Sequence, residues 1–375
     1  MSKYTVNAGS SFDLIVERDL NLIISRCLKS KYASVIKSIV LMGSYGRGEG
    51  TAFQTPYGVK PFNDYDLVVV GSAMNEFKRR KVQKEFHRLE HLLSAELDIT
   101  VDLFLHTENS LKRAESTLMN YEMKYGHMVV YGDDAILDLM PSCKNVDLSE
   151  ATRLLLNRGK LLLDISKRIK NDDEFTEDEL LLYKKYLNKV VLAMGDAALM
   201  ASGYNTILYR EKLDQIHNIS GFTDRTWLIE EYQTAVAFKF IGDVDLLPSD
   251  IKISFEDIKE HFMKFYFEFE GVRLHKAIPG YQSYYSEMSL DKKALSKIDR
   301  FKNLYLNIKT FGLKEFLNHA WLLRHPRERL FVVFPLLLQS QLSLKESLIA
   351  SRLEGCTQNF DHCVNTFYQL REKYL

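Results

Sequence analysis

Features that would direct a protein to an oxidising compartment or a membrane are missing from this sequence. Its 375 residues include only four cysteines, and neither a CxxC pair nor a cysteine and histidine cluster with zinc spacing occurs. Reduced, mostly buried thiols are therefore expected at Cys27, Cys143, Cys356 and Cys363. A secretory signal and an ordinary membrane span are not predicted, because the first residues lack a basic and then apolar segment and no run of about eighteen apolar residues occurs.

The sequence also lacks net charge. Lysine and arginine together number 50, as do aspartate and glutamate, so the formal net charge is zero. Without a positive field the chain has no general attraction to polyanions. We expect a cytoplasmic protein with no membrane partner, and a long nucleic acid is not favoured as its ligand.

The pattern of apolar residues changes along the chain. Hydrophobic residues make up 46% of it, which is enough for more than one core. Helical and strand-like periodicities alternate at first, whereas helical periodicity dominates after Pro141. We therefore predict an α+β protein in which residues 1–140 form a mixed sheet flanked by helices and residues 141–375 form an all-helical domain.

Within the first part, the periodicity predicts individual elements. Helices are expected at residues 10–30 and 75–96, and strands at residues 38–42, 64–70, 98–105 and 128–131.

A glycine-rich segment follows the first predicted strand. Residues 43–50 read GSYGRGEG, with four glycines in eight residues, which is unfavourable in regular core structure. We predict a turn leading into a helix, whose exposed N–H groups and positive end favour an anion such as phosphate. Gly43 lets the backbone approach the ligand, and Ser44 adds a hydroxyl donor. Arg47 has two open roles, a phosphate contact or a pairing with a carboxylate.

Three carboxylates follow in strand-like segments. Asp64 and Asp66 are two residues apart, so on a strand both point to one face. Asp102 lies in the apolar segment VDLFL, where a carboxylate needs a partner to offset its desolvation. If the two strands are neighbours, the three carboxylates converge and can hold two hard divalent cations such as Mg²⁺. Asp98 is a rival to Asp102, since residues four apart on a strand point to the same face. Asp102 is preferred, because capping explains Asp98 at the start of the predicted strand.

The order of these motifs resembles the polymerase-β nucleotidyltransferase superfamily, and GSYGRGE looks especially like its minimal members; related antibiotic nucleotidyltransferases share the plan. The resemblance covers about residues 36 to 132. It implies a polymerase-β-like domain in which Gly43 and Ser44 bind the β and γ phosphates of a nucleoside triphosphate. It also implies that Asp64, Asp66 and Asp102 are catalytic and bind Mg²⁺ or Mn²⁺.

One departure from the family pattern concerns the segment after the glycine turn. Asp64 lies twenty positions after Ser44, a longer gap than in minimal members of the family, so residues 51–61 are interpreted as an inserted loop. The segment and the residue that follows it contain three aromatic residues, which are candidates for base stacking or for ordinary loop packing: Phe53, Tyr57 and Phe62. Lys189, on a predicted helix of the second part, is a further nucleotide-binding candidate, because the resemblance implies a helical lysine near the triphosphate.

The resemblance implies a metal-dependent transfer of a nucleoside monophosphate from a triphosphate to a hydroxyl acceptor, with release of pyrophosphate. The acceptor is left open among a small molecule, a protein and a tRNA. Two alternatives remain: a cyclic or linear oligonucleotide synthase of bacterial signalling type, and a non-catalytic nucleotide-binding regulatory module.

Overall fold

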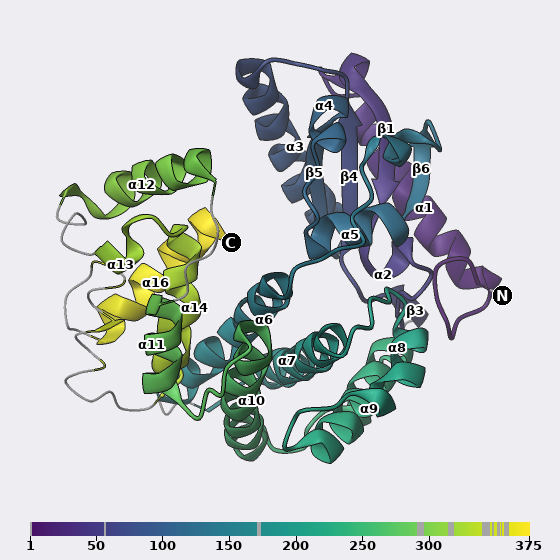
Figure 1. The fold of residues 1–375 in the computed structure, drawn as a ribbon. Coiled ribbons are helices and arrows are strands. Elements are labelled where there is room, and N and C mark those ends of the chain that lie inside the picture. Colours follow the sequence, from purple (N-terminus) through teal and green to yellow (C-terminus); the bar gives the residue numbers. More distant parts are fainter. Residues whose placement is uncertain are drawn as a thin grey trace. The chain divides into compact units, whose positions relative to one another are not determined.

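The computed structural model divides the protein into two compact units (Figure 1). It describes residues 2–55, 58–170, 174–290, 296–313, 319–339 and 360–375, together with residues 346, 349, 350, 353 and 355. Unit 1 comprises Met1–Glu150, Tyr204–His217 and Glu230–Leu247, and unit 2 comprises Ala151–Gly203, Asn218–Ile229 and Pro248–Leu375.

Unit 1 contains the strands and a set of helices on both sides of them. Its elements are α1 (Ser10–Leu28), β1 (Ile36–Leu41), α2 (Gly43–Gly46), β2 (Ala52–Thr55), β3 (Gly58–Pro61), β4 (Tyr65–Gly71), α3 (Glu76–Leu97), β5 (Val101–Thr107), α4 (Glu108–Lys112), α5 (Leu118–Tyr125), β6 (Met128–Gly132), α8 (Tyr209–Gln215) and the greater part of α9 (Arg225–Ile241).

The main sheet has four strands in the order β5-β4-β1-β6. The β4 and β5 strands are parallel, whereas β1 pairs antiparallel with both β4 and β6. The mixed sheet and the α+β class predicted from the sequence are therefore confirmed. A second sheet is the hairpin of β2 and β3, within the segment that was expected to be an irregular loop.

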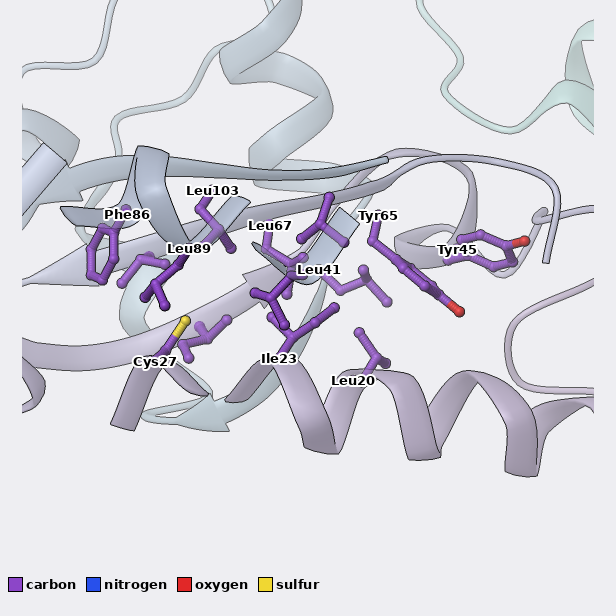
Figure 2. Packing of buried hydrophobic residues seen from close by; sticks show 14 of the residues in the cluster. Leu20, Ile23, Cys27, Leu41, Tyr45, Tyr65, Leu67, Phe86, Leu89 and Leu103 are labelled. Carbon is purple, nitrogen blue, oxygen red and sulfur yellow. The ribbon is translucent and has the colours of Figure 1, made fainter. Parts of the chain in front are cut away.

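Both faces of the main sheet are buried, each in its own hydrophobic cluster. On one face α1 and α3 cover the sheet, and Figure 2 shows Leu20, Ile23 and Cys27 on the side of α1 that faces the sheet and α3. These α1 residues recur at helical spacing, which places them on one side of the helix. The opposite face, with alternate residues of the same strands, packs against α4 and α5.

Unit 2 is built from helices. Its described residues contain no strand, and its helices are α6 (Leu148–Lys170, which starts in unit 1), α7 (Glu177–Ala201), α10 (Ile251–Leu274), α11 (Tyr281–Leu290), α12 (Lys297–Phe311), α13 (His319–Leu322), α14 (Pro326–Leu337) and α16 (Phe360–Tyr374). Unit 2 contains a buried carboxylate: Glu270 accepts hydrogen bonds from Thr152 Oγ1 at 2.5 Å and Tyr284 Oη at 2.7 Å. Arg273 completes the charge pairing.

The compact units do not coincide with the predicted continuous domains 1–140 and 141–375. Two later segments, residues 204–217 and 230–247, belong to the unit that contains the sheet. The physical reason is hydrogen bonding over long sequence distances: Thr51 Oγ1 donates to the carbonyl of Lys239, and Glu49 accepts the backbone N–H of Tyr209. Hydrophobic periodicity contains no information about such contacts.

None of the helices in the described part of the chain is both long enough and apolar enough to cross a bilayer. Cys27, Cys143 and Cys363 are free and buried, and Cys356 lies outside the described residues.

The packing of α1 predicts a contrast between two leucines on the same helix. Leu20 is 3% exposed and Leu14 is 68% exposed. Leu20→Ala should lower the free energy of unfolding by about 2–5 kcal/mol, since it removes buried methyl groups and leaves a cavity. Leu14→Ala should change it by less than about 0.5 kcal/mol. Urea titration followed by circular dichroism measures both, and equal losses would contradict the assigned burial.

Candidate active site

The structure brings two of the predicted carboxylates together across neighbouring strands. Asp66 on β4 and Asp102 on β5 are direct register partners in the parallel pair. Side chains at paired positions of parallel strands point to the same face, so both carboxylates lie on the face opposite α1 and α3. Asp64 is exposed and immediately precedes β4, two residues before Asp66.

The three carboxylates affect one another electrostatically. Burial and then the negative charges of Asp64 and Asp102 together raise the pKa of Asp66 to about 6, whereas Arg47 opposes the shift. The pKa of Asp102 is also raised, first by burial and then by Asp64 and Glu90. A carboxyl group whose pKa is raised by neighbouring carboxylates lies in a field that favours a cation.

The donor set therefore fits a hard divalent cation by its chemistry. Carboxylate oxygens are the ligands that Mg²⁺ prefers, and the local field at Asp66 is negative. Within the described ranges, however, no group of three or more His, Cys, Asp or Glu side chains is arranged as a set of metal ligands.

The glycine turn lies directly against the buried carboxylate. Gly43 has a left-handed φ of 63°, and a Cβ atom added there would lie 2.3 Å from Oδ2 of Asp66. Backbone contact reinforces the approach, because the N–H of Met42 donates to the carbonyl of Asp66 at 2.7 Å. Only glycine tolerates this conformation and this proximity. The turn therefore presents the start of α2 beside the carboxylates, where the first N–H groups have no acceptor within the helix.

Ser44 contacts a lysine that the sequence interpretation missed. The ammonium group of Lys239, on α9, donates a hydrogen bond to Ser44 Oγ at 2.7 Å. Lys239 lies within the apolar stretch AVAFKFI, residues 235–241, where a charged residue requires a polar partner. That requirement was the one available signal, and it could not indicate which partner the lysine meets.

Arg47 is paired with carboxylates. Its side chain is 8% exposed, and its guanidinium lies 3.9 Å from Glu49 and 3.6 Å from Glu122. Of the two roles left open by the sequence, the observed contacts are those of carboxylate pairing, and its charge also acts on Asp66. Contact with phosphate stays a prediction.

The aromatic residues of the inserted segment and Lys189 were the remaining nucleotide-binding candidates. Phe53 and Phe62 stack on each other with ring centroids 5.1 Å apart, and Phe62 meets the edge of Phe238 at 5.9 Å. These contacts are the ordinary packing alternative, whereas Tyr57 lies outside the described residues. Lys189 is exposed on α7 of unit 2 and stays a prediction.

Asp98 is not on a strand. It is the left-handed C-cap of α3, with a φ of 53°, and its side chain is 94% exposed. Its contact is an ion pair with Lys60 at 3.6 Å. Asp98 is therefore separated from the position that Asp102 occupies on β5, in agreement with the preference for Asp102.

Comparisons with known proteins identify a similar solved structure but no matching family. No family model matches the sequence. No curated protein matches it either. Among solved structures, the chain is similar to spectinomycin adenyltransferase AAD(9) from Enterococcus faecialis, whose structure was determined with ATP and spectinomycin. The identity is 13% and the TM-score 0.39, over 66% of this chain and 99% of that one. So low a TM-score assigns neither a family nor an activity to the chain.

The raised pKa of Asp66 predicts a stability change that depends on pH. Its carboxyl group has a higher pKa in the folded state, about 6, than its ordinary value of 3.8. The folded state therefore loses stability as the pH rises from about 4 to about 6, and the loss persists above that. In metal-free buffer, Asp66→Asn should raise the free energy of unfolding at pH 8 by on the order of 1–3 kcal/mol.

The gain should become much smaller at pH 4 and vanish at lower pH, where Asp66 is protonated in both states. Urea titrations at pH 4 and pH 8 in the presence of a chelator measure the difference. Asp98→Asn is the control, since Asp98 is exposed at the C-cap of α3. A gain for Asp66→Asn that is equal at both pH values would contradict the electrostatic origin.

Proposed function

We propose that this protein is a metal-dependent nucleotidyltransferase, which transfers a nucleoside monophosphate from a nucleoside triphosphate to a hydroxyl acceptor and releases pyrophosphate. The observation that supports it most is the parallel register of Asp66 and Asp102 on one face of the sheet, with the Gly43 turn against Asp66. Phosphoryl transfer depends on positioning and on charge stabilisation, and this arrangement supplies groups for both.

The glycine turn and Lys239 are the proposed triphosphate-binding groups. The backbone of Gly43 comes close to the ligand, and Ser44 donates its hydroxyl to a phosphate oxygen. Lys239 already donates to Ser44 Oγ, so its ammonium group is within reach of a phosphate bound at the same hydroxyl. Arg47, the C-cap residue of α2, adds a positive charge at the end of the turn.

Asp64, Asp66 and Asp102 are the residues proposed to hold Mg²⁺ or Mn²⁺. The bound ions would neutralise charge on the triphosphate and lower the pKa of the acceptor hydroxyl.

The proposed transfer breaks one bond and forms one. The acceptor oxygen bonds to the α-phosphorus, the bond from that phosphorus to the pyrophosphate oxygen breaks, and the bonding electrons leave with pyrophosphate. Asp102 is the proposed acceptor of the hydroxyl proton, and its raised pKa makes it a better base than an ordinary aspartate. Asp66 lies closest to the turn and so to the phosphates.

The acceptor is best identified by labelling. Each labelled triphosphate is offered with Mg²⁺ or Mn²⁺ to the protein alone, and then with a cell extract separated into protein, RNA and small molecules. Transfer of label to one fraction identifies the class of acceptor. Product formed from nucleotide alone would instead indicate an oligonucleotide synthase, and binding without pyrophosphate release would indicate a regulatory module.

Substitution of the carboxylates tests the proposed chemistry. Asp64→Asn and Asp66→Asn should each reduce pyrophosphate release at least about a hundredfold, since the charge that holds the cation is lost. Asp102→Asn should reduce it similarly while changing the Kd for triphosphate by less than about threefold, or ~0.6 kcal/mol. Asp98→Asn, with the same chemical change on an exposed residue, should retain activity. Full activity in the three variants would refute the proposal.

A pair of lysine variants tests the triphosphate site. Lys239→Met should weaken triphosphate binding about tenfold or more, since a charge-assisted hydrogen bond contributes about 1.5–3 kcal/mol. Lys189→Met, the same change on an exposed lysine of α7, should weaken it less than about twofold. Calorimetric titration with ATP and Mg²⁺ measures both constants. A larger effect for Lys189→Met would restore the helical lysine expected from the sequence.

A further inference from the structure

Glu49 is a fully buried carboxylate whose main partners lie far away in the sequence. Its side chain is 0% exposed. Its two oxygens accept the backbone N–H groups of Tyr209 at 3.0 Å and Arg210 at 3.3 Å. These are the first two residues of α8, whose N-cap residue, Leu208, has no side-chain cap. Glu49 therefore supplies the missing cap and complements the positive end of the helix dipole.

The residue that Glu49 anchors contacts the lysine at the phosphate turn. The ring of Tyr209 lies under the ammonium group of Lys239, with Nζ 4.9 Å from the ring centroid. The same ring meets Tyr232 of α9, with centroids 6.5 Å apart. Tyr209 thus links α8 to α9 at the position of Lys239, and a cation over an aromatic face is held by the negative charge of that face.

Both Glu49 and Lys239 also form hydrogen bonds with Ser44 in the glycine turn. The backbone N–H of Glu49 donates to the carbonyl of Ser44 at 2.8 Å, and the hydroxyl of Ser44 accepts the hydrogen bond from Lys239 at 2.7 Å. The path therefore runs from Ser44 to Glu49, to Tyr209, to Lys239 and back to Ser44. All four residues belong to unit 1.

We infer that Glu49 is a positioning residue for the triphosphate site: by anchoring Tyr209 at the start of α8, it holds the ammonium group of Lys239 against Ser44. The inference rests on the proposed function, because it assigns Glu49 a role in binding the same triphosphate. Glu49 does not touch the ligand itself. Its effect on binding passes through Lys239.

The neighbouring salt bridge offers an alternative route that a control can test. Glu49 lies 3.9 Å from Arg47, and Glu122 lies 3.6 Å from the same guanidinium. A change at Glu49 could therefore act through the charge of Arg47 alone. Glu122→Gln removes a carboxylate from Arg47 without touching α8, so it separates the two routes.

A double-mutant cycle tests the inference. The probes are ATP and inorganic tripolyphosphate, each titrated calorimetrically with Mg²⁺ into the full-length protein. Glu49→Gln keeps the size of the side chain but loses its charge, and it should weaken binding of both probes about three- to twentyfold as Lys239 is released. In the Lys239→Met background, Glu49→Gln should weaken binding less than twofold further, because its effect is already lost. Glu122→Gln should not weaken binding.

The inference would be overturned if the loss of affinity in the double variant equalled the product of the losses in Glu49→Gln and Lys239→Met. Wild-type affinity for Glu49→Gln would also overturn it. A loss for Glu122→Gln equal to that for Glu49→Gln would also overturn it, in favour of Arg47. If wild-type protein binds neither probe, the proposed function itself fails, which is a different result from additivity in a protein that binds.

A second variant tests the same contact without changing the buried carboxylate of Glu49. Tyr209→Leu keeps the backbone N–H that Glu49 accepts but removes the ring beneath Lys239. It should weaken binding of both probes by about the same factor as Glu49→Gln, and it should add less than twofold in the Lys239→Met background. Unchanged binding in Tyr209→Leu would show that the ring does not position the lysine, and would overturn the inference even if Glu49→Gln does not fold.

Discussion

The parallel register of β4 and β5 is the constraint on which the rest of the site depends. The residues of β4 that face α1 and α3 are Tyr65, Leu67 and Val69, whereas Asp66 lies between them on the other face. A slip of one residue would bury Asp66 among the apolar side chains beneath α1 and α3 and move Tyr65 to the opposite face, at a large cost in free energy. The same hydrophobic alternation that stabilises the sheet therefore aligns Asp66 with Asp102.

The order of local elements could be predicted because each has its own pattern. The helix at α1, the strands β1, β4, β5 and β6, and the glycine turn all follow from periodicity or composition, with shifts of a few residues at their ends. The start of β5 was placed too early, because Asp98 takes the left-handed C-cap conformation instead of continuing a strand. The convergence of Asp66 and Asp102 followed from strand adjacency alone.

Contacts between distant segments could not be predicted from one sequence. The hairpin of β2 and β3 is held by Phe53 and Phe62, which stack across it, and a single pair of aromatic residues in a segment with two prolines gave no strand periodicity. The lysine beside Ser44 proved to be Lys239, since spacing along the chain does not show which helix reaches the turn. The same limit applies to Glu49, whose partners on α8 are separated from it by 160 and 161 positions.

Unit 1 is assembled from segments that are far apart in the sequence and are therefore synthesised at different times. The hydrogen bond between Ser44 and Lys239 spans 195 positions. Most of unit 1 is synthesised before the segments of unit 2 that lie between these two residues in the sequence. During translation, the sheet and α1 can pack as soon as residue 132 is available, but the phosphate turn receives its lysine only after α9 has emerged. Until then Glu49 has no helix to cap, and closing so long a loop carries an entropic cost. A nascent chain would therefore hold a folded sheet without a completed triphosphate site for the time needed to add about a hundred residues, or about 5–20 s at common rates of synthesis.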